Sequence, residues 1–338
     1  MSVFFSIIIP TFQQHQYISD CIKGFLNQSY TDFEVIISDD SEDELTANVC
    51  NAFFDERIRY FHNKPRLGRV ENYRVCVAER ALGKWCIICD GDDYFTDRDY
   101  LQYVKHVIQD CPELVLIQAG HKKGTHSDHY QTELPEIEGE KMVMKGIDYL
   151  LHFRKFNHFS HMSTVSRLEV LKVISPFQLP ILSTDLDTYL RLSAHGSVCL
   201  LKRDVGFWRQ HAANASGTDN LTDQFVNLRW INNVFNYWFQ SADPSQQYRI
   251  HKWRNWQLKG SLLYLLKWSG SNSTRLLSWL FEFVSISFQE GYLRILLSSG
   301  NLCHSYRTFQ KAFILILCVV LLVCCIKVEM RVMLHYTG

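Results

Sequence analysis

The sequence lacks an excess of charge of either sign, a paired cysteine framework and a recognisable leader segment. The 35 basic and 35 acidic residues balance to a formal net charge of zero, so there is no electrostatic footprint for nucleic acid. The eleven cysteines are odd in number and follow no repeating spacing, which indicates reduced thiols in a cytoplasmic setting. A strand is expected within the first few residues, which leaves no room for a signal peptide. These absences favour a protein that works inside the cell.

Acidic residues are present where an apolar run ends. Residues 85–89 (WCIIC) form a short, β-prone run that predicts a buried strand. Asp90, Asp92 and Asp93 follow it directly, and open α/β sheets bind ligands at the carboxyl ends of their strands. Three adjacent carboxylates repel one another unless a cation holds them, and a divalent metal carrying phosphates is the most economical one. Because Asp-Gly-Asp-Asp is also typical of a solvated turn, the motif alone leaves both interpretations open.

The N-terminal half alternates strand and helix patterns. Periodicity predicts, in chain order, a strand over 6–11, a helix over 17–26, a strand over 33–38, a helix over 45–54, a strand over 58–61, a helix up to about 82 and the strand over 85–89. Two of these strands end in acids, at Asp39 with Asp40 and at the cluster above. The order predicts a parallel sheet of the nucleotide-binding type.

Several of these segments together resemble family 2 glycosyltransferases. The resemblance rests on the segments 6–12 (SIIIPTF), 26–30 (LNQSY) and 34–41 (EVIISDDS), on Asn63, Gly68 and Asn72, on Gly83-Lys84, and on Asp90-Gly91-Asp92-Asp93. Their order and approximate spacing match over residues 3–100 and more loosely to 216. The resemblance implies a GT-A fold, a nucleotide-sugar donor, and a divalent metal, Mn²⁺ or Mg²⁺, bound by an Asp-x-Asp motif.

The resemblance also implies roles for single residues. Pro10 and Thr11 would line the nucleotide pocket, and Asp40, with Asp39 beside it, would recognise the base or ribose. Asp92 would coordinate the metal on the donor diphosphate, and Asp90 would lie against the ribose or sugar. These types suit the chemistry, because ribose hydroxyls need acceptors and a hard cation prefers oxygen. A helix N-terminus is the alternative for 39–41, and it does not explain why two acids follow a buried strand.

A base for the acceptor hydroxyl is expected in residues 183–192 (STDLDTYLRL). The family's acidic pair maps here onto Thr184 and Asp185, so only Asp185 matches the implied catalytic base. The same residues also predict the start of an amphipathic helix, and both interpretations can hold at once. Asp187 is expected to be a first-turn helix acid.

A third segment, 208–216 (WRQHAANAS), resembles the family's aromatic-Arg-x-His stretch. Arg209 could neutralise diphosphate oxygens by a forked contact, and His211 could be a metal or phosphate ligand. A single histidine is as often an ordinary hydrogen-bonded residue, so that interpretation stays open for His211.

The C-terminal third is rich in Trp, Leu and Phe. Residues 253–297 predict helices that either cap the core or lie in a membrane interface. Residues 312–326 carry no charge and are flanked by Lys311 and Lys327. The run is shorter than the about 20 apolar residues of a spanning helix, but both lysines could snorkel. We therefore expect a membrane segment, with a buried core helix as the alternative.

Together these patterns predict a GT-A, Rossmann-like, mostly parallel α/β sheet flanked by helices. The expected organisation is a catalytic domain over 1–216 (a nucleotide-sugar half over 1–100 and an acceptor half over 101–216), a helical, membrane-interfacial region over 217–310, and a transmembrane segment with a short tail over 311–338.

The expected function is inverting sugar transfer from a nucleotide diphosphate to a glycan or lipid-linked precursor. It would take place on the cytoplasmic face of a membrane, the bacterial inner membrane in particular, in polysaccharide biosynthesis. Two alternatives stay open. A non-catalytic nucleotide-sugar-binding member of the family is favoured by Thr184, and a haloacid-dehalogenase-type phosphatase also uses Asp-x-Asp after a strand. In the phosphatase family the fourth residue after the first Asp is Thr or Val, whereas this chain has Tyr94 at that position.

Overall fold

The computed structural model describes residues 3–126, 129–156, 160–212, 214 and 220–271. The chain divides into two compact units. The first comprises Met1–Gly217 and Trp230–Ile250, and the second comprises Thr218–Arg229 and His251–Gly338. The apolar run 312–326 and most of the expected helices over 253–297 lie outside the described residues.

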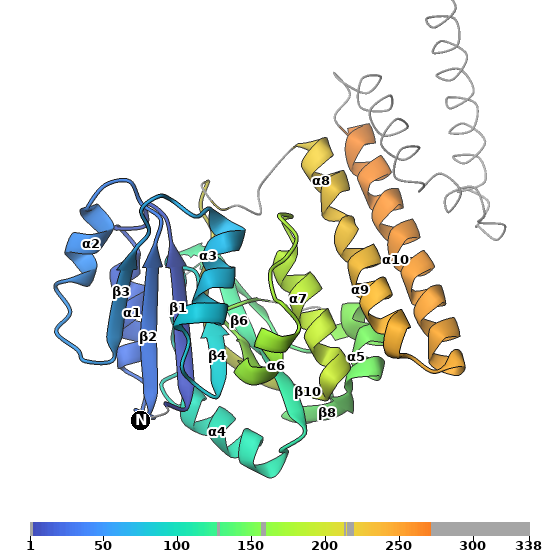
Figure 1. Ribbon diagram of the computed structural model, residues 1–338, viewed down its shortest axis with the longest axis horizontal. Coiled ribbons are helices and arrows are strands. Elements are labelled where there is room, and N and C mark those ends of the chain that lie inside the picture. Colours follow the sequence, from blue (N-terminus) through green and yellow to red (C-terminus); the bar gives the residue numbers. More distant parts are fainter. Residues whose placement is uncertain (1–2, 127–128, 157–159, 213, 215–219, 272–338) are drawn as a thin grey trace, which may run out of the picture. The chain divides into compact units, whose positions relative to one another are not determined.

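Strands and helices alternate over residues 5–88, and beyond them consecutive strands and consecutive helices also occur (Figure 1). The strands are β1 (Phe5–Thr11), β2 (Phe33–Asp39), β3 (Ile58–His62), β4 (Trp85–Ile88), β5 (Tyr94–Phe95), β6 (Leu114–His126), β7 (His129–Glu133), β8 (Lys141–Lys145), β9 (Thr164–Arg167) and β10 (Ser197–Arg209). The helices are α1 (Ile18–Leu26), α2 (Leu45–Cys50), α3 (Arg69–Val75), α4 (Tyr100–Asp110), α5 (Gly146–His152), α6 (Leu168–Val173), α7 (Thr184–Leu192), α8 (Leu221–Asn227), α9 (Arg229–Ser241) and α10 (Pro244–Ser271). Short helical turns are η1 (Cys76–Arg80), η2 (Phe153–Phe156) and η3 (Ser193–His195).

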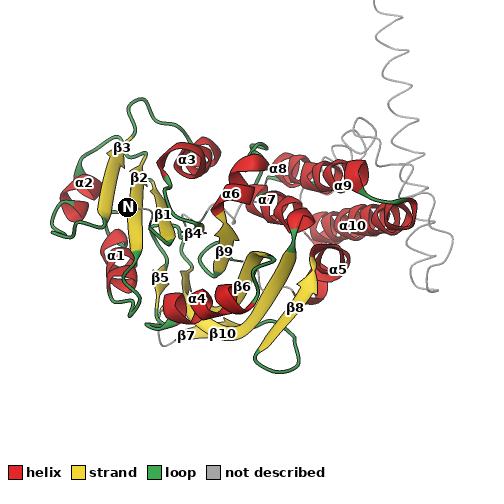
Figure 2. Cartoon of the chain, turned by 60° about the horizontal axis from the view of Figure 1, so that its bottom comes forward, coloured by secondary structure: helices red, strands yellow, loops and turns green. Residues whose placement is uncertain are grey.

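The sheet is mixed, which corrects the expectation of a mostly parallel one. Its strands run in the order β3-β2-β1-β4-β9-β6-β10-β5, with β7 beside β6 and β8 beside β10. The first four strands are parallel, as predicted, but β9 enters between β4 and β6 antiparallel to both. Figure 2 shows these strands in yellow with red helices on their faces. Hydrophobic periodicity indicates where a strand lies but not its direction, so this reversal had no local signal.

The N-terminal strands are buried on both faces. Every residue of β1 and β2 is buried, which explains their unbroken apolar sequences. Phe5, Ile7 and Ile9 point to the face where the core also includes side chains of α1 and α4. Each such side chain stabilises the fold by about 1.5–3 kcal/mol. This packing holds the ends of β1, β2 and β4 in fixed positions at one edge of the sheet.

Strand register brings the acidic segments together at that edge. Thr11 at the end of β1 is level with Asp39 at the end of β2, and Ile8 is level with Ile88 on β4. The Asp90 loop therefore begins beside the end of β1. The strands bring together residues about 80 positions apart in the sequence, as the parallel arrangement requires.

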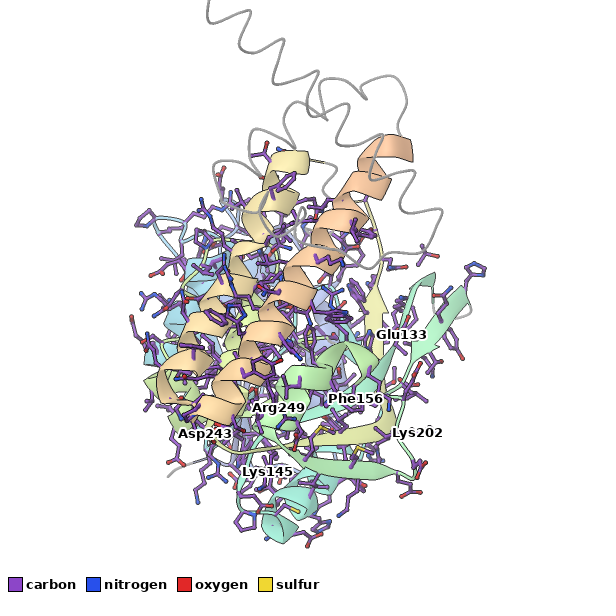
Figure 3. The ribbon with its side chains drawn as sticks, turned by 90° about the vertical axis from the view of Figure 1, so that its right-hand side faces the viewer. Glu133, Lys145, Phe156, Lys202, Asp243 and Arg249 are labelled. Carbon is purple, nitrogen blue, oxygen red and sulfur yellow. The ribbon has the colours of Figure 1, made fainter. Side chains whose placement is uncertain are left out.

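Strand β10 brings a distant segment to the same edge. It pairs in parallel with β6 and antiparallel with β8 and β5, and its last residue is Arg209. Figure 3 labels Lys145 at the end of β8 and Lys202 on β10. Because β5 begins at Tyr94, directly after the Asp90 loop, the β5–β10 pairing places Arg209 beside the acidic cluster.

The helices agree only in part with the predicted ranges. The helix expected over 45–54 ends at Cys50, and the one expected up to about residue 82 ends in the turn η1 at Arg80. In the second unit, Leu258, Leu262 and Leu265 are buried on α10, consistent with their helical spacing. Among the helices that the structure describes, none combines the length and the apolar character that crossing a bilayer requires.

Candidate active site

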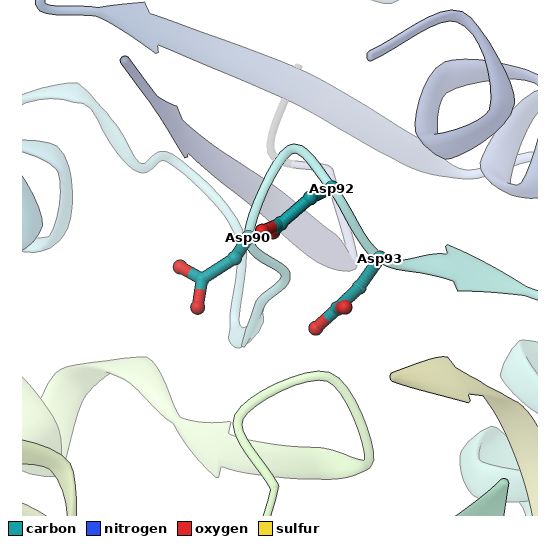
Figure 4. Close-up of side chains that lie close together, drawn as sticks. All are labelled: Asp90, Asp92 and Asp93. Atoms are coloured by element: carbon teal, nitrogen blue, oxygen red, sulfur yellow. The ribbon is translucent and has the colours of Figure 1, made fainter. Parts of the chain in front are cut away.

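Three carboxylates gather on the loop between β4 and β5. Asp90, Asp92 and Asp93 each offer an oxygen, and these ligand atoms all lie within 4.8 Å of one another. Figure 4 shows the three side chains projecting from the single loop. Asp92 and Asp93 are buried, with exposed fractions of 6% and 5%. A solvated turn would leave these side chains in water, so the burial of Asp92 and Asp93 argues against that interpretation of the motif.

The carboxylates of the cluster are buried and repel one another. Burial, and then the charge of Asp90, raises the pKa of Asp92 above its ordinary value. Burial, followed by the charges of Asp92 and Asp90, raises the pKa of Asp93 well above its ordinary value. A set of carboxylate oxygens is what a hard divalent ion such as Mn²⁺ or Mg²⁺ prefers, and such an ion would offset this repulsion. The residues present therefore fit the expected metal.

This electrostatic situation predicts a pH-dependent response to metal. Without metal, a carboxyl with a raised pKa stabilises the fold at low pH, and this contribution is lost as the pH rises through the raised value. Metal binding requires the charged carboxylates, so its stabilisation grows as the pH rises. We expect MnCl₂ to increase the melting temperature more at about pH 7.5 than at about pH 5. Differential scanning fluorimetry measures this, and equal gains at both pH values would contradict the metal assignment.

His211 lies against the acidic cluster. Its Nε2 atom is 2.8 Å from Oδ2 of Asp92, and Asn214 Nδ2 is 3.4 Å from the same oxygen. The ring stacks on Tyr17, with 5.1 Å between ring centroids. His211 is therefore placed where it could join Asp92 as a metal ligand.

Arg209 also reaches the cluster, but by its backbone. Its backbone N–H donates to Asp93 Oδ1 at 2.9 Å. The guanidinium forms an ion pair with Asp20 at 2.9 Å and lies over the rings of Tyr17 and Tyr94. Asp20 is 54% exposed at its side chain, so this pair is open to exchange with an anionic ligand.

Gly91 allows the acidic loop to press against the end of β1. A Cβ atom at this position would lie 2.6 Å from Gln14 Oε1 and 3.0 Å from Thr11 Oγ1. Thr11 Oγ1 donates to Gln14 Oε1 at 2.9 Å, which holds both side chains against the loop. Thr11 and Pro10 are buried at the end of β1. Thr11, one of the two expected pocket-lining residues, thus lies within contact range of the Asp90 loop.

Asp39 and Asp40 are both buried and both bonded within the protein. Asp39 Oδ2 accepts from the Tyr60 hydroxyl at 2.7 Å, and its Oδ1 accepts from the Ser41 backbone N–H at 2.9 Å. Asp40 Oδ2 accepts from the Gly68 N–H at 2.7 Å. Gly68 has a φ of 83°, a conformation that side chains disfavour. The base or ribose role of this pair remains a prediction, and holding the 63–68 loop is a role that the structure adds.

The motif asparagines have structural roles in this network. Asn63 Nδ2 donates to Asp40 Oδ1 at 2.8 Å, and Asn63 Oδ1 accepts from Arg80 NH2 at 2.7 Å. Asn72 Nδ2 donates to the Ser38 carbonyl at 2.9 Å. Both side chains are buried, and a buried polar group costs free energy unless it is hydrogen-bonded. They tie the loop after β3 and the helix α3 to the end of β2.

Asp185 lies in the first turn of α7, which begins at Thr184 as the sequence predicts. Its Oδ2 is 3.3 Å from Nε2 of His161. Tyr73 connects this region to the acidic cluster, because its hydroxyl donates to Asp90 Oδ1 at 2.8 Å and its ring is 5.3 Å from that of His161. The expected base and the expected donor-binding carboxylate therefore lie around the same buried tyrosine.

Asp187 is engaged in a buried ion pair, as its expected non-catalytic role requires. Its Oδ2 accepts from Arg191 Nε at 2.9 Å, and its Oδ1 accepts from Asn233 Nδ2 at 2.8 Å. Neither partner of the ion pair is more than 2% exposed at its side chain. The Arg191 guanidinium also donates to the carbonyl of Ile174 at 2.6 Å. These bonds fasten α7 to the loop before it and to α9.

This pair predicts a large stability effect. Asp187→Asn leaves the Arg191 charge buried and unpaired, which should lower the free energy of unfolding by about 3–5 kcal/mol. Urea denaturation measures the loss. The double variant Asp187→Leu with Arg191→Met is the matched control, because it removes both charges and should recover most of the stability. A stable Asp187→Asn protein that loses only turnover would instead make Asp187 a candidate base.

The structure brings to the site two residues, Tyr73 and His161, to which the sequence interpretation gave no role, and it adds a hydrogen-bond partner for Asp93. Asp93 is part of the acidic motif, but the sequence does not show that its side chain is buried or that it accepts a hydrogen bond from the Arg209 backbone N–H. Tyr73 follows the motif residue Asn72, which was the available hint. His161 lies in the 120–180 region, where no motif is recognisable, so no sequence signal pointed to it.

Comparison with known proteins identifies a matching family and several relatives. Residues 6–172 match the model of glycosyl transferase family 2. The glycosyltransferase GlyG of Streptococcus pneumoniae is 31% identical over 97 residues, which cover 28% of this chain and 31% of that protein. A GalNAc(5)-diNAcBac-PP-undecaprenol beta-1,3-glucosyltransferase of Campylobacter jejuni is 31% identical over 90 residues, covering 26% and 29%.

Solved structures share the fold. The crystal structure of S. aureus TarS 1-349 in complex with UDP-GlcNAc superposes with a TM-score of 0.60 at 15% identity, and the alignment covers 84% of this chain and 81% of TarS. The TarS complex with UDP gives 0.59 over a similar share. At this identity the likeness shows the fold, which agrees with the predicted GT-A architecture.

These findings place the protein in a class. The α/β domain carries an acidic loop at the carboxyl ends of its parallel strands, which is where open α/β sheets bind their ligands. The chain belongs to glycosyl transferase family 2 through residues 6–172. The phosphatase alternative is therefore set aside. The matched region spans about a third of the length of the curated relatives above.

Proposed function

We propose that the protein transfers a sugar from a nucleotide diphosphate to a hydroxyl of a glycan or lipid-linked precursor, in cell-surface polysaccharide biosynthesis. The observation that carries this proposal is the acidic cluster at the sheet edge, connected through Tyr73 and His161 to Asp185. The UDP-GlcNAc bound to TarS and the lipid-linked substrate named for the Campylobacter relative support the donor and acceptor classes.

The residues divide between donor binding and proton removal. Asp92 and His211 would hold a divalent ion, together with Asp90 or Asp93, and Pro10, Thr11 and Asp40 would line the nucleotide site. When bound, the ion supplies positive charge that stabilises the leaving diphosphate. Arg209 would exchange its Asp20 partner for the diphosphate and add a forked contact.

Asp185 would act as the general base. It accepts the proton of the acceptor hydroxyl while that oxygen bonds to the anomeric carbon, and the bond to the diphosphate breaks with its electron pair. Attack from the face opposite the diphosphate inverts the configuration. Asp185 is on α7, a different element from the Asp90 loop, which suits a base that approaches from the acceptor side.

A panel of nucleotide sugars tests the proposal. Each donor is incubated with the full chain with and without MnCl₂, and release of the nucleoside diphosphate is measured. We expect metal-dependent hydrolysis or transfer with one donor or a small group of them. Tight binding of a donor without any turnover would favour the non-catalytic alternative, for which Thr184 in place of an acid is the motivating feature.

Membrane association at the cytoplasmic face is part of the proposal and rests on the uncharged run 312–326. Deleting residues 312–338 should release at least part of the protein from membranes and leave the nucleotide site folded, because the α/β unit buries its own strands. Fractionation by ultracentrifugation and nucleotide binding measure this.

Two results would contradict the membrane proposal. If the run were a core helix, its removal would expose a large apolar surface, and the truncated protein should aggregate. A full-length protein that stays entirely in the supernatant without detergent would also rule out an anchor.

A further inference from the structure

His161 contacts the expected base from a different part of the chain. It lies just before β9, 24 positions from Asp185 (185 − 161), and its Nε2 is 3.3 Å from Asp185 Oδ2. Both side chains are largely buried, with exposed fractions of 11% for His161 and 19% for Asp185. An exposed ion pair contributes little free energy, whereas a polar contact sheltered from water fixes the orientation of the two side chains.

The other ring nitrogen of His161 faces a second residue of α7. Nδ1 is 3.3 Å from the hydroxyl oxygen of Tyr189, which lies one helical turn after Asp185. Burial raises the pKa of Tyr189 well above its ordinary value, so this phenol keeps its proton and can donate it. When Tyr189 donates to Nδ1, a neutral imidazole must carry its hydrogen on Nε2, which is the nitrogen beside Asp185.

Helix geometry explains why one histidine reaches both residues. Positions four apart lie on one face of a helix, so Asp185 and Tyr189 present their side chains to the same side of α7. Asp187 and Arg191 form the corresponding pair on another face, where they bond to each other. The first face of α7 therefore meets His161, and the other anchors the helix.

Aromatic rings hold the imidazole in place. Tyr73 from α3 and Phe177 from the loop before α7 lie 5.3 and 6.3 Å from the His161 ring, centroid to centroid. The Tyr189 ring lies at 5.8 Å. Among the residues that the structure describes, Asp185, Tyr189 and Tyr73 are titratable groups that face His161, and Tyr73 donates to Asp90 beyond it. The two tyrosines are phenols whose pKa is raised chiefly by burial, so both keep their protons.

We propose that His161 is a positioning residue that donates from Nε2–H to Asp185 Oδ2, with Tyr189 selecting the tautomer. This inference rests on the proposed function of Asp185. The hydrogen bond occupies one carboxylate oxygen and directs the other toward the acceptor hydroxyl. It also favours the charged carboxylate, which is the form that can accept a proton. Tyr189, His161 and Asp185 thereby form a chain of donors that ends on the base.

Kinetics of two substitutions test the role. His161→Leu removes the donor, and we expect kcat to fall about 10- to 100-fold with the donor KM nearly unchanged. The acid limb of its pH–rate profile should move to higher pH, because the carboxylate loses a bond that favoured its charged form. His161→Gln keeps a donating nitrogen and should recover most of the rate and the profile. His106→Leu, at an exposed position on α4, is the matched control.

Nitrogen NMR tests the hydrogen bond independently of turnover. In protein labelled with ¹⁵N-histidine, the signals lost in His161→Gln identify this residue. We expect the Nε2–H tautomer in the wild type and a mixture of tautomers in Tyr189→Phe. A wild-type His161 with its hydrogen on Nδ1, or a His161→Leu variant with wild-type kcat and pH profile, would overturn the inference.

The outcomes separate this inference from the proposed function. If Asp185→Asn abolishes turnover while His161→Leu does not alter it, His161 is not a positioning residue and the base assignment stands. If the tautomer is as expected but Asp185→Asn transfers sugar normally, the hydrogen bond exists and the assigned base is wrong.

Discussion

Asp92→Asn should abolish transfer and weaken donor binding chiefly when metal is present. The amide keeps the shape and one acceptor oxygen but loses the charge that a hard cation requires. Asp92 is buried beside two other carboxylates and His211, and its charge is part of the site that the ion would occupy. Turnover assays, with calorimetric titration of the donor in MnCl₂ and in EDTA, measure both effects.

The metal dependence of binding distinguishes this prediction from simple unfolding. In EDTA the variant and the wild type should bind the donor equally weakly, whereas in MnCl₂ only the wild type should gain affinity. Asp110→Asn, which changes a mostly exposed carboxylate at the end of α4, is the matched control and should behave as the wild type. Wild-type activity and wild-type metal dependence in Asp92→Asn would mean that the site is misassigned.

Asp185→Asn should reduce turnover by about a hundredfold or more and leave donor binding nearly intact. The amide cannot accept the proton of the acceptor hydroxyl. The contact that the structure describes for the Asp185 carboxylate is with His161, which has no assigned role in binding the diphosphate. Single-turnover kinetics with a saturating donor, together with a donor binding isotherm, separate the two quantities.

A structural role for Asp185 would give a different result. Equal losses of donor affinity and turnover would identify Asp185 as a helix-start residue whose replacement disturbs α7. Asp187→Asn provides the comparison on the same helix, since it should lose stability because of its buried partner Arg191. If turnover in Asp185→Asn is unaffected, Asp187 becomes the next residue to test.

The local elements of the donor half were readable from the sequence. A run such as 33–38 is apolar because both faces of its strand are buried, and that pattern is visible without any neighbour. Asp39 and Asp90 come at the ends of apolar runs, so the sequence alone shows where these strands end. The carboxyl ends of parallel strands lie at one edge of a sheet, which places both acids at that edge. The first turn of α7 was likewise predictable, because acids and hydroxyls favour a helix start.

The tertiary structure decided which distant side chains meet. Strand β9 reverses the sheet, and β10 carries Arg209 and His211 to a loop more than 100 residues earlier in the chain. His161 reaches Asp185 only because the chain before β9 passes the first turn of α7. Strand direction and register depend on contacts between segments far apart, and hydrophobic periodicity within one segment carries no information about them.

Long-range contacts also give the two acids on α7 different surroundings. In the sequence, Asp185 and Asp187 are two similar carboxylates, distinguished only by their place in a motif. In the fold, one faces an imidazole near the acidic cluster and the other is buried against a guanidinium. Residue type and spacing indicated a metal site at the acidic cluster, and the resemblance to family 2 glycosyltransferases implied a base at Asp185. The partner of each carboxylate depends on long-range packing, and only the folded chain specifies it.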